Sequence, residues 1–205
     1  VDWKNYTDYF IAETYYINND WIGDWNNNIK LWRPRKAGGK WRYILYDLDF
    51  GLGLYSNHNY NKLEELMSPS SQNHQSDIFN KMIQNPTYRN YFINRYADLV
   101  NTIYQPNNIK NIAYEMRDSI AADMPLQFAR WGSSMANWSQ NMANLINFSN
   151  KRPARALNYV ESTLGLNAKL YSHWMFFHKE QDVYKLVRLC RIHFPGRAPT
   201  LMEIR

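Results

Sequence analysis

One predicted β-hairpin stands in a chain whose other hydrophobic patterns are helical. Residues 29–33 and 41–50 are rich in aliphatic and aromatic side chains, as strands are. The connection between them, residues 34–40, contains Gly38-Gly39, which supplies the positive φ angles that a hairpin turn demands. The sequence therefore predicts two antiparallel strands within a mixed fold.

Helical periodicity dominates the rest of the chain. In residues 2–19 apolar side chains recur every three or four positions, which predicts an amphipathic helix with a stripe of Trp3, Tyr6, Phe10, Thr14 and Ile17. A second stripe follows Pro86 and consists of Tyr88, Phe92, Tyr96, Leu99 and Ile103. Further helices are predicted at about 108–122, 138–148 and 153–163, with polar linkers such as 68–76 between elements. Together with the hairpin, these helices predict an α+β fold.

Charge divides the 205 residues unevenly. The net charge is +6, yet residues 167–205 alone carry seven Lys or Arg against three acidic side chains. We therefore predict a main domain over residues 1–166 and an atypical basic tail over 167–205, and no nucleic-acid partner. Cys190 is the single cysteine, and His173 and His178 lack the spacing of a zinc site, so neither a disulfide nor zinc is predicted.

The predicted second strand ends in Asp47-Leu48-Asp49-Phe50-Gly51. Alternation along a strand would place Asp47 and Asp49 on one face, about 7 Å apart. Two carboxylates so close repel each other unless a cation lies between them, and Mg²⁺ prefers such ligands. The alternative is that both acids bind the amides of a turn before Gly51 and Gly53.

A second polar cluster precedes the hairpin and comprises Asp20, Asp24, Asn26, Asn27 and Asn28. Phosphoryl transfer uses an Asp to orient the acceptor hydroxyl and an Asn and an Asp to hold Mg²⁺ on the phosphates. Those residue types occur here in the chain order of a protein-kinase catalytic segment. A plain Asn-rich turn is the alternative.

These motifs together resemble the CotH family, the kinase-like proteins related to spore coat protein H. The resemblance covers about residues 2–166. It is carried by Tyr-Phe-Ile-Ala-Glu at 9–13, Asn-Asp-Trp at 19–21, Asn-Asn-Ile-Lys-Leu-Trp-Arg at 27–33 and Gly-Lys-Trp-Arg-Tyr-Ile-Leu-Tyr-Asp-Leu-Asp-Phe-Gly at 39–51. Arg-Trp-Gly at 130–132 and Arg152-Pro153 add weaker support.

The resemblance implies an atypical protein kinase fold that uses ATP and Mg²⁺ to phosphorylate protein serines. It implies that Asp20 is the catalytic Asp, that Asn28 and Asp47 bind the cofactor, and that Asn28, Asp47 and Asp49 hold the metal. Asp20 and Asn28 lie eight positions apart, three more than is usual in the family, so Asp24 is an alternative catalytic residue. The chain matches a kinase large lobe, and we expect a fragment without the small lobe that covers ATP. Inactivity of this fragment is therefore an alternative to activity.

Two other functions stay open at this point. A metal-dependent glycosyltransferase could use Asp-x-Asp to bind a nucleotide sugar, and a non-catalytic module could bind carbohydrate or a coat partner through its many aromatic and Asn side chains. The sequence shows neither a membrane span nor a signal peptide. The family habit implies a secreted, cell-envelope or spore-surface location.

Overall fold

The computed structural model describes residues 1–22, 27–69, 74–167 and 169–171. In chain order the elements are α1 (Trp3–Tyr16), β1 (Lys30–Trp32), β2 (Arg42–Ile44), α2 (Lys62–Met67), α3 (His74–Ile83), α4 (Pro86–Asn101), α5 (Pro106–Ile120), α6 (Met124–Trp131) and α7 (Met135–Thr163). The α+β prediction is confirmed. No helix within these ranges is long and apolar enough to cross a membrane. Almost all of the predicted tail, 167–205, lies outside the described residues.

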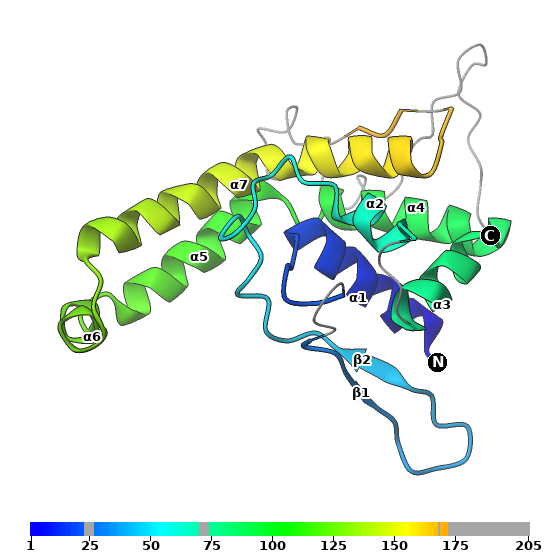
Figure 1. Ribbon diagram of the computed structural model, residues 1–205, viewed down its shortest axis with the longest axis horizontal. Coiled ribbons are helices and arrows are strands. Elements are labelled where there is room, and N and C mark those ends of the chain that lie inside the picture. Colours follow the sequence, from blue (N-terminus) through cyan, green and yellow to red (C-terminus); the bar gives the residue numbers. More distant parts are fainter. Residues whose placement is uncertain (23–26, 70–73, 168, 172–205) are drawn as a thin grey trace, which may run out of the picture.

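Helix α1 forms the centre of the body (Figure 1), where it contacts β2, α2 and α4. Its N-cap is Asp2, whose carboxylate accepts a hydrogen bond from the Asn5 N–H at 3.4 Å. Most of the helix is buried, including the predicted stripe members Tyr6 and Phe10. Trp3 was predicted in the same stripe but is exposed, because it belongs to the first turn and packs edge-on against Tyr91 of α4.

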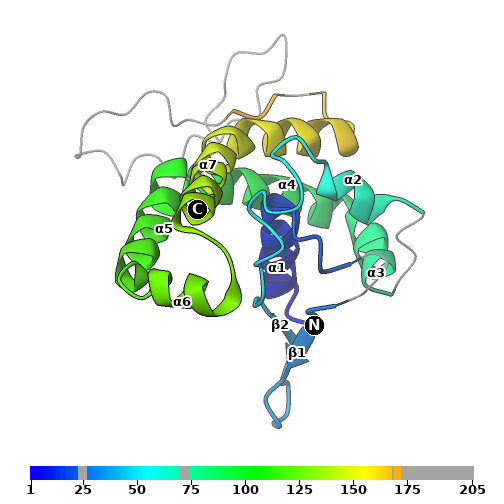
Figure 2. The same cartoon turned by 60° about the vertical axis from the view of Figure 1, so that its left-hand side comes forward.

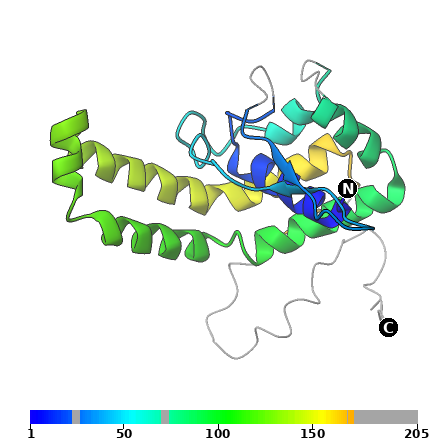
Figure 3. The same cartoon turned by 90° about the horizontal axis from the view of Figure 1, so that it is seen from below.

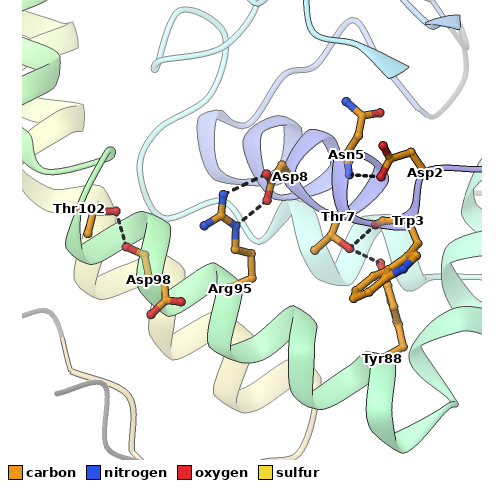
Figure 4. A network of polar contacts seen from close by, with 9 residues as sticks. All are labelled: Asp2, Trp3, Asn5, Thr7, Asp8, Tyr88, Arg95, Asp98 and Thr102. Atoms are coloured by element: carbon orange, nitrogen blue, oxygen red, sulfur yellow. Dashed lines mark hydrogen bonds and ion pairs between the residues drawn. The ribbon is translucent and has the colours of Figure 1, made fainter. Parts of the chain in front are cut away.

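Helix α4 is held against α1 by polar contacts as well as by its apolar stripe (Figure 4). Arg95 donates two hydrogen bonds to the Asp8 carboxylate, at 2.6 and 2.9 Å, and the Thr7 hydroxyl bonds the Tyr88 hydroxyl at 3.2 Å. The stripe prediction is confirmed for four of its members but is wrong for Ile103, which is exposed because the helix ends at Asn101.

The hairpin is shorter than predicted. Its antiparallel register pairs Lys30 with Ile44, Leu31 with Tyr43 and Trp32 with Arg42. The Tyr43 ring is buried against α1 and stacks on Tyr9 with 4.8 Å between centroids. The Asn5 side chain accepts from the Tyr43 N–H at 2.7 Å and donates to its C=O at 3.2 Å. Asn5 thus fastens the outer edge of β2 to α1, and Figure 3 shows the hairpin crossing that helix.

Helix α7 is continuous, so the prediction of separate helices at 138–148 and 153–163 is wrong. Pro153 lies inside it, where the missing N–H removes one helical hydrogen bond, but the buried neighbours Arg152, Ala156 and Leu157 anchor the helix on both sides of that position. The other half of α7 pairs with α5 in an arm that leaves the body, and α6, which the sequence analysis missed, lies at the far end of this arm (Figures 1 and 2).

Arg152 joins α7 to the carboxyl end of α1. Its guanidinium is buried and donates to the carbonyls of Thr14 at 2.9 Å and Tyr15 at 2.8 Å. It also donates to the carbonyls of His58 at 3.0 Å and Tyr60 at 2.8 Å. A cation at the carboxyl end of a helix is favoured by the helix dipole, and here it also satisfies carbonyls that have no helical partner.

Replacing Arg152 should therefore destabilise the whole domain. We expect Arg152→Met to lower the free energy of unfolding by on the order of 3–5 kcal/mol, because four carbonyls, two of them in buried hydrogen bonds, lose their donor. Urea unfolding followed by circular dichroism measures this loss. Arg155→Met, one turn further along α7 at an exposed position, is the matched control and should change stability by less than about 1 kcal/mol. Equal losses in the two variants would contradict the role given to Arg152.

Candidate functional site

The site begins where α1 ends. Ile17 adopts a left-handed conformation with φ of 57°, and its N–H still bonds the Glu13 carbonyl. The Asn18 N–H donates to the same carbonyl at 3.1 Å. Such a backbone conformation is uncommon for a β-branched residue, and it reverses the chain within two positions. The reversal brings Asn18 and Asp20 next to the end of the helix.

Asp20 lies beside the Asn residues that precede the hairpin. Its Oδ2 accepts hydrogen bonds from the side-chain amides of Asn27 at 2.9 Å and Asn28 at 3.1 Å. The Asn28 amide also donates to the Asp20 carbonyl at 3.1 Å, and Asn28 itself is left-handed with φ of 54°. The eight-residue spacing thus still brings Asp20 and Asn28 together. Asp24, the alternative catalytic residue, lies outside the described residues.

Asp47 and Asp49 are not strand residues, so the alternation argument for their shared face is wrong. Strand β2 ends at Ile44, and Asp47 is left-handed with φ of 57°, which breaks the pleat. The Asp49 carboxyl nevertheless lies close enough to act on the pKa of the Asp47 carboxyl. Both are exposed, whereas Asp20 is half-buried.

Gly51 allows the segment after Asp47 to lie directly on the end of α1. The Leu52 N–H donates to the Tyr16 carbonyl at 2.9 Å, and the Gly51 N–H donates to the Leu48 carbonyl at 3.0 Å. A Cβ at position 51 would come within 2.9 Å of the Tyr16 carbonyl oxygen and 3.0 Å of the Leu48 carbonyl oxygen. Any larger residue would therefore push the Asp47 segment away from the helix.

Negative charge is concentrated at this point. Desolvation raises the pKa of the Asp47 carboxyl, the neighbouring Asp49 and Asp20 raise it further, and Lys30 acts in the opposite direction. The structure thus brings Asp20, Asn28, Asp47 and Asp49 into one region. Within the described ranges, no three His, Cys, Asp or Glu side chains form a group that could hold a metal by themselves. A cation here would therefore need amide or phosphate oxygens in addition to the carboxylates.

Glu13 belongs to the site, although the sequence analysis did not select it. It is buried, its Oε2 accepts from the Asn18 amide at 2.9 Å, and its Oε1 has no hydrogen-bond partner in the described part of the chain. Burial raises the pKa of the Glu13 carboxyl to about 7, against a lowering by the Asn18 hydrogen bond. The only signal in the sequence was a Glu beside the apolar stripe of the predicted helix.

The raised pKa of Glu13 predicts a pH dependence of stability. An acid whose pKa rises from 4.5 to about 7 on folding holds its proton more firmly in the folded state, so stability falls as the pH rises through that window. Relative to Glu13→Gln, the native protein should lose on the order of 3 kcal/mol between pH 4.5 and pH 7, and the difference should be constant above that.

Urea unfolding of both proteins across this pH range tests the prediction. The amide introduced by Glu13→Gln adds a pH-independent offset, so the slope of the difference is the quantity to compare. Glu115→Gln, at an exposed position of α5, is the control and should show no such slope. A flat difference between the native protein and Glu13→Gln would show that Glu13 titrates as an ordinary carboxyl.

Comparison with known proteins identifies the family but no close relative. No curated protein and no solved structure matches the chain. The family model described as CotH kinase protein matches residues 1–155 of the 205. That range contains the end of α1, the Asn-rich segment before the hairpin, the Asp47 segment and the buried Arg152. The chain therefore belongs to the CotH kinase protein family.

Proposed function

We propose that this kinase-like domain transfers the γ-phosphoryl group of ATP to serine hydroxyls of proteins, with Mg²⁺ as the metal. One observation carries the proposal: Asp20, hydrogen-bonded to Asn28, and Asp47, beside Asp49, converge at the end of α1 from three separate segments. Phosphoryl transfer needs mainly such positioning of an acceptor-orienting carboxylate next to metal-binding oxygens.

Asp20 is proposed to orient and deprotonate the acceptor. Its Oδ2 is occupied by Asn27 and Asn28, which fixes the carboxylate and leaves Oδ1 to accept the proton of a serine hydroxyl. As that hydroxyl oxygen bonds to the γ-phosphorus, the bond between the γ-phosphorus and the oxygen bridging to the β-phosphate breaks, and ADP leaves. The two amide donors to Oδ2 hold the carboxylate in one rotamer for this contact.

Asp47, Asp49 and Asn28 are the residues proposed to hold Mg²⁺. The fit rests on the carboxylates around Asp47: desolvation raises the pKa of that carboxyl, and Asp49 and Asp20 raise it further. A divalent cation would relieve the repulsion between these carboxylates. The Nδ2 of Asn28 donates to Asp20, so Oδ1 is the Asn28 atom that could bind a cation. When bound, Mg²⁺ would neutralise charge on the transferred phosphate. Coat, cell-surface or secreted proteins are the proposed substrates, in line with the family resemblance.

A binding module is the second candidate, and the hairpin favours it. Trp32 and Trp41 are exposed, with Arg42 and Arg33 lying over their rings at 5.9 and 5.0 Å. Exposed aromatic rings with adjacent cations suit a polar ligand such as a glycan. Glycan binding that persists in Asp47→Ala, without nucleotide binding by the native chain, would favour this function.

We expect the chain to bind ATP only in the presence of Mg²⁺. Asp47→Ala should weaken this binding at least tenfold, because the proposed metal loses its central ligand. Isothermal titration calorimetry with ATP, with and without Mg²⁺, measures both effects. Asp118→Ala removes an exposed carboxylate of α5 and should leave the affinity unchanged. Equal affinity in all three proteins would contradict the proposed metal site, and a preference for UDP-sugar with Mn²⁺ would favour a glycosyltransferase.

Transfer itself should depend on Asp20 more than binding does. Asp20→Asn keeps the size of the side chain but cannot take a proton, so we expect transfer to fall by roughly 10²- to 10⁴-fold while the affinity for MgATP changes only a few-fold. Phosphate incorporation into a serine-centred peptide library measures this. If Asp24→Asn abolishes transfer and Asp20→Asn does not, the catalytic role belongs to Asp24.

A further inference from the structure

The Asn18 side chain is buried, and its hydrogen bonds reach α1, the Asp47 segment and, within its own turn, Asp20. Its Nδ2 donates to Glu13 Oε2 of α1 at 2.9 Å and to the Asp47 carbonyl oxygen at 3.3 Å. Its Oδ1 accepts from the Asp20 N–H at 3.1 Å. One amide thus contacts the backbone of Asp20 and of Asp47, two of the three aspartates to which the proposed function gives roles.

The Asn18 side-chain amide is held in a fixed position on α1. The Asn18 N–H is bonded to the Glu13 carbonyl, and the Asn18 side chain is bonded to the Glu13 carboxyl, so both ends of the residue are fixed to α1. Glu13 is itself fully buried, and Lys62 is the charged group whose field acts on it. A buried amide whose two N–H groups and oxygen are all hydrogen-bonded has little freedom to move.

The hydrogen bond from Asn18 to Asp47 is made to a residue whose backbone conformation is strained. The Asp47 backbone is left-handed, a sparsely populated conformation that costs free energy and persists where the surroundings hold it. The bond from Asn18 to the Asp47 carbonyl helps to hold that conformation and with it the direction of the Asp47 side chain. The same segment is also held by the Leu52 N–H, which donates to the Tyr16 carbonyl of α1, and by the Gly51 N–H, which donates to the Leu48 carbonyl within the segment.

We propose that Asn18 is the positioning residue of this site, which sets the Asp20 carboxylate relative to the Asp47 carboxylate by hydrogen-bonding the backbone of both while anchored on Glu13. The inference rests on the proposed function for its catalytic meaning. The arrangement itself exists in the free chain, so it can be tested without nucleotide.

A pair of substitutions separates positioning from mere stability. Asn18→Asp keeps the acceptor for the Asp20 N–H, loses the donor to Asp47 and places a carboxylate against the Glu13 carboxyl. Adding Glu13→Gln returns a donor and acceptor pair between positions 13 and 18 with the roles exchanged, since the new amide at position 13 can donate to the new carboxylate at position 18. The Asp47 carbonyl still has no donor from position 18 in this double variant.

We expect Asn18→Asp to unfold at lower urea concentration than the native protein and the double variant to recover most of that loss. In both variants, amide hydrogen exchange of Gly51 and Leu52 should be at least tenfold faster, while that of the Asp20 N–H stays close to native. Affinity for MgATP should remain at least tenfold weaker in the double variant. Asn61→Asp is the matched control, because Asn61 joins α2 to Thr163 of α7, and it should leave exchange at Gly51 and Leu52 unchanged.

Two results would overturn the proposal. One is a double variant that recovers native exchange at Gly51 and Leu52 together with stability, which would give Asn18 a purely structural role. The other is native exchange at these residues in Asn18→Asp. If the native chain shows no affinity for MgATP, the proposed function fails for this chain, and the exchange data still decide whether Asn18 links the two segments.

Discussion

The position of the whole site depends on the cation that Arg152 brings to the end of α1. Four carbonyls, from α1 and from residues 58 and 60, share one buried guanidinium. The last carbonyls of a helix are acceptors without helical donors, and a buried cation needs acceptors. The guanidinium therefore supplies the donors that these carbonyls lack, and the carbonyls supply the acceptors that the cation needs. Because the turn to Asn18 and Asp20 starts within three residues of Thr14 and Tyr15, the contact that places α7 also places that turn.

Strained backbone is concentrated at the same place. Within the described ranges, Ile17, Asn28, Asp47 and Leu52 are the non-glycine residues with positive φ, and all four lie in the segments that build the site. Each such residue costs about 1–3 kcal/mol and persists only where its surroundings determine it. Here the surroundings are hydrogen bonds between segments, such as those from Asn18 to Asp47 and from Leu52 to Tyr16. The fold thus stabilises these turns through long-range contacts.

The dependence of these turns on long-range contacts explains which features the sequence could predict and which it could not. The α4 stripe and the existence of the hairpin follow from local periodicity, and both predictions are confirmed, apart from Ile103 in the stripe. The prediction that Asp47 and Asp49 share one face of a strand is wrong, because a hydrophobic pattern does not indicate a left-handed residue such as Asp47. The interruption expected at Pro153 failed because buried packing outweighs one lost hydrogen bond. Asn18 was not predicted as a site residue because its contact with Asp47, 29 positions along the chain, forms only in the folded protein.

Charge along the chain agrees with the proposed chemistry. Residues 27–46 contain six Lys or Arg and no acidic residue, and this basic segment lies between Asp20 and Asp47, which belong to the acidic part of the site. An anionic nucleotide would approach a positive hairpin, whereas its metal would settle on the carboxylates at the base of that hairpin. The basic hairpin would attract the phosphates of a metal–nucleotide complex, and the carboxylates would attract its metal. The two attractions would therefore orient the complex as well as hold it. A neutral glycan carries no such separation of charge, so it would contact the exposed Trp rings of the hairpin without using the carboxylates at its base.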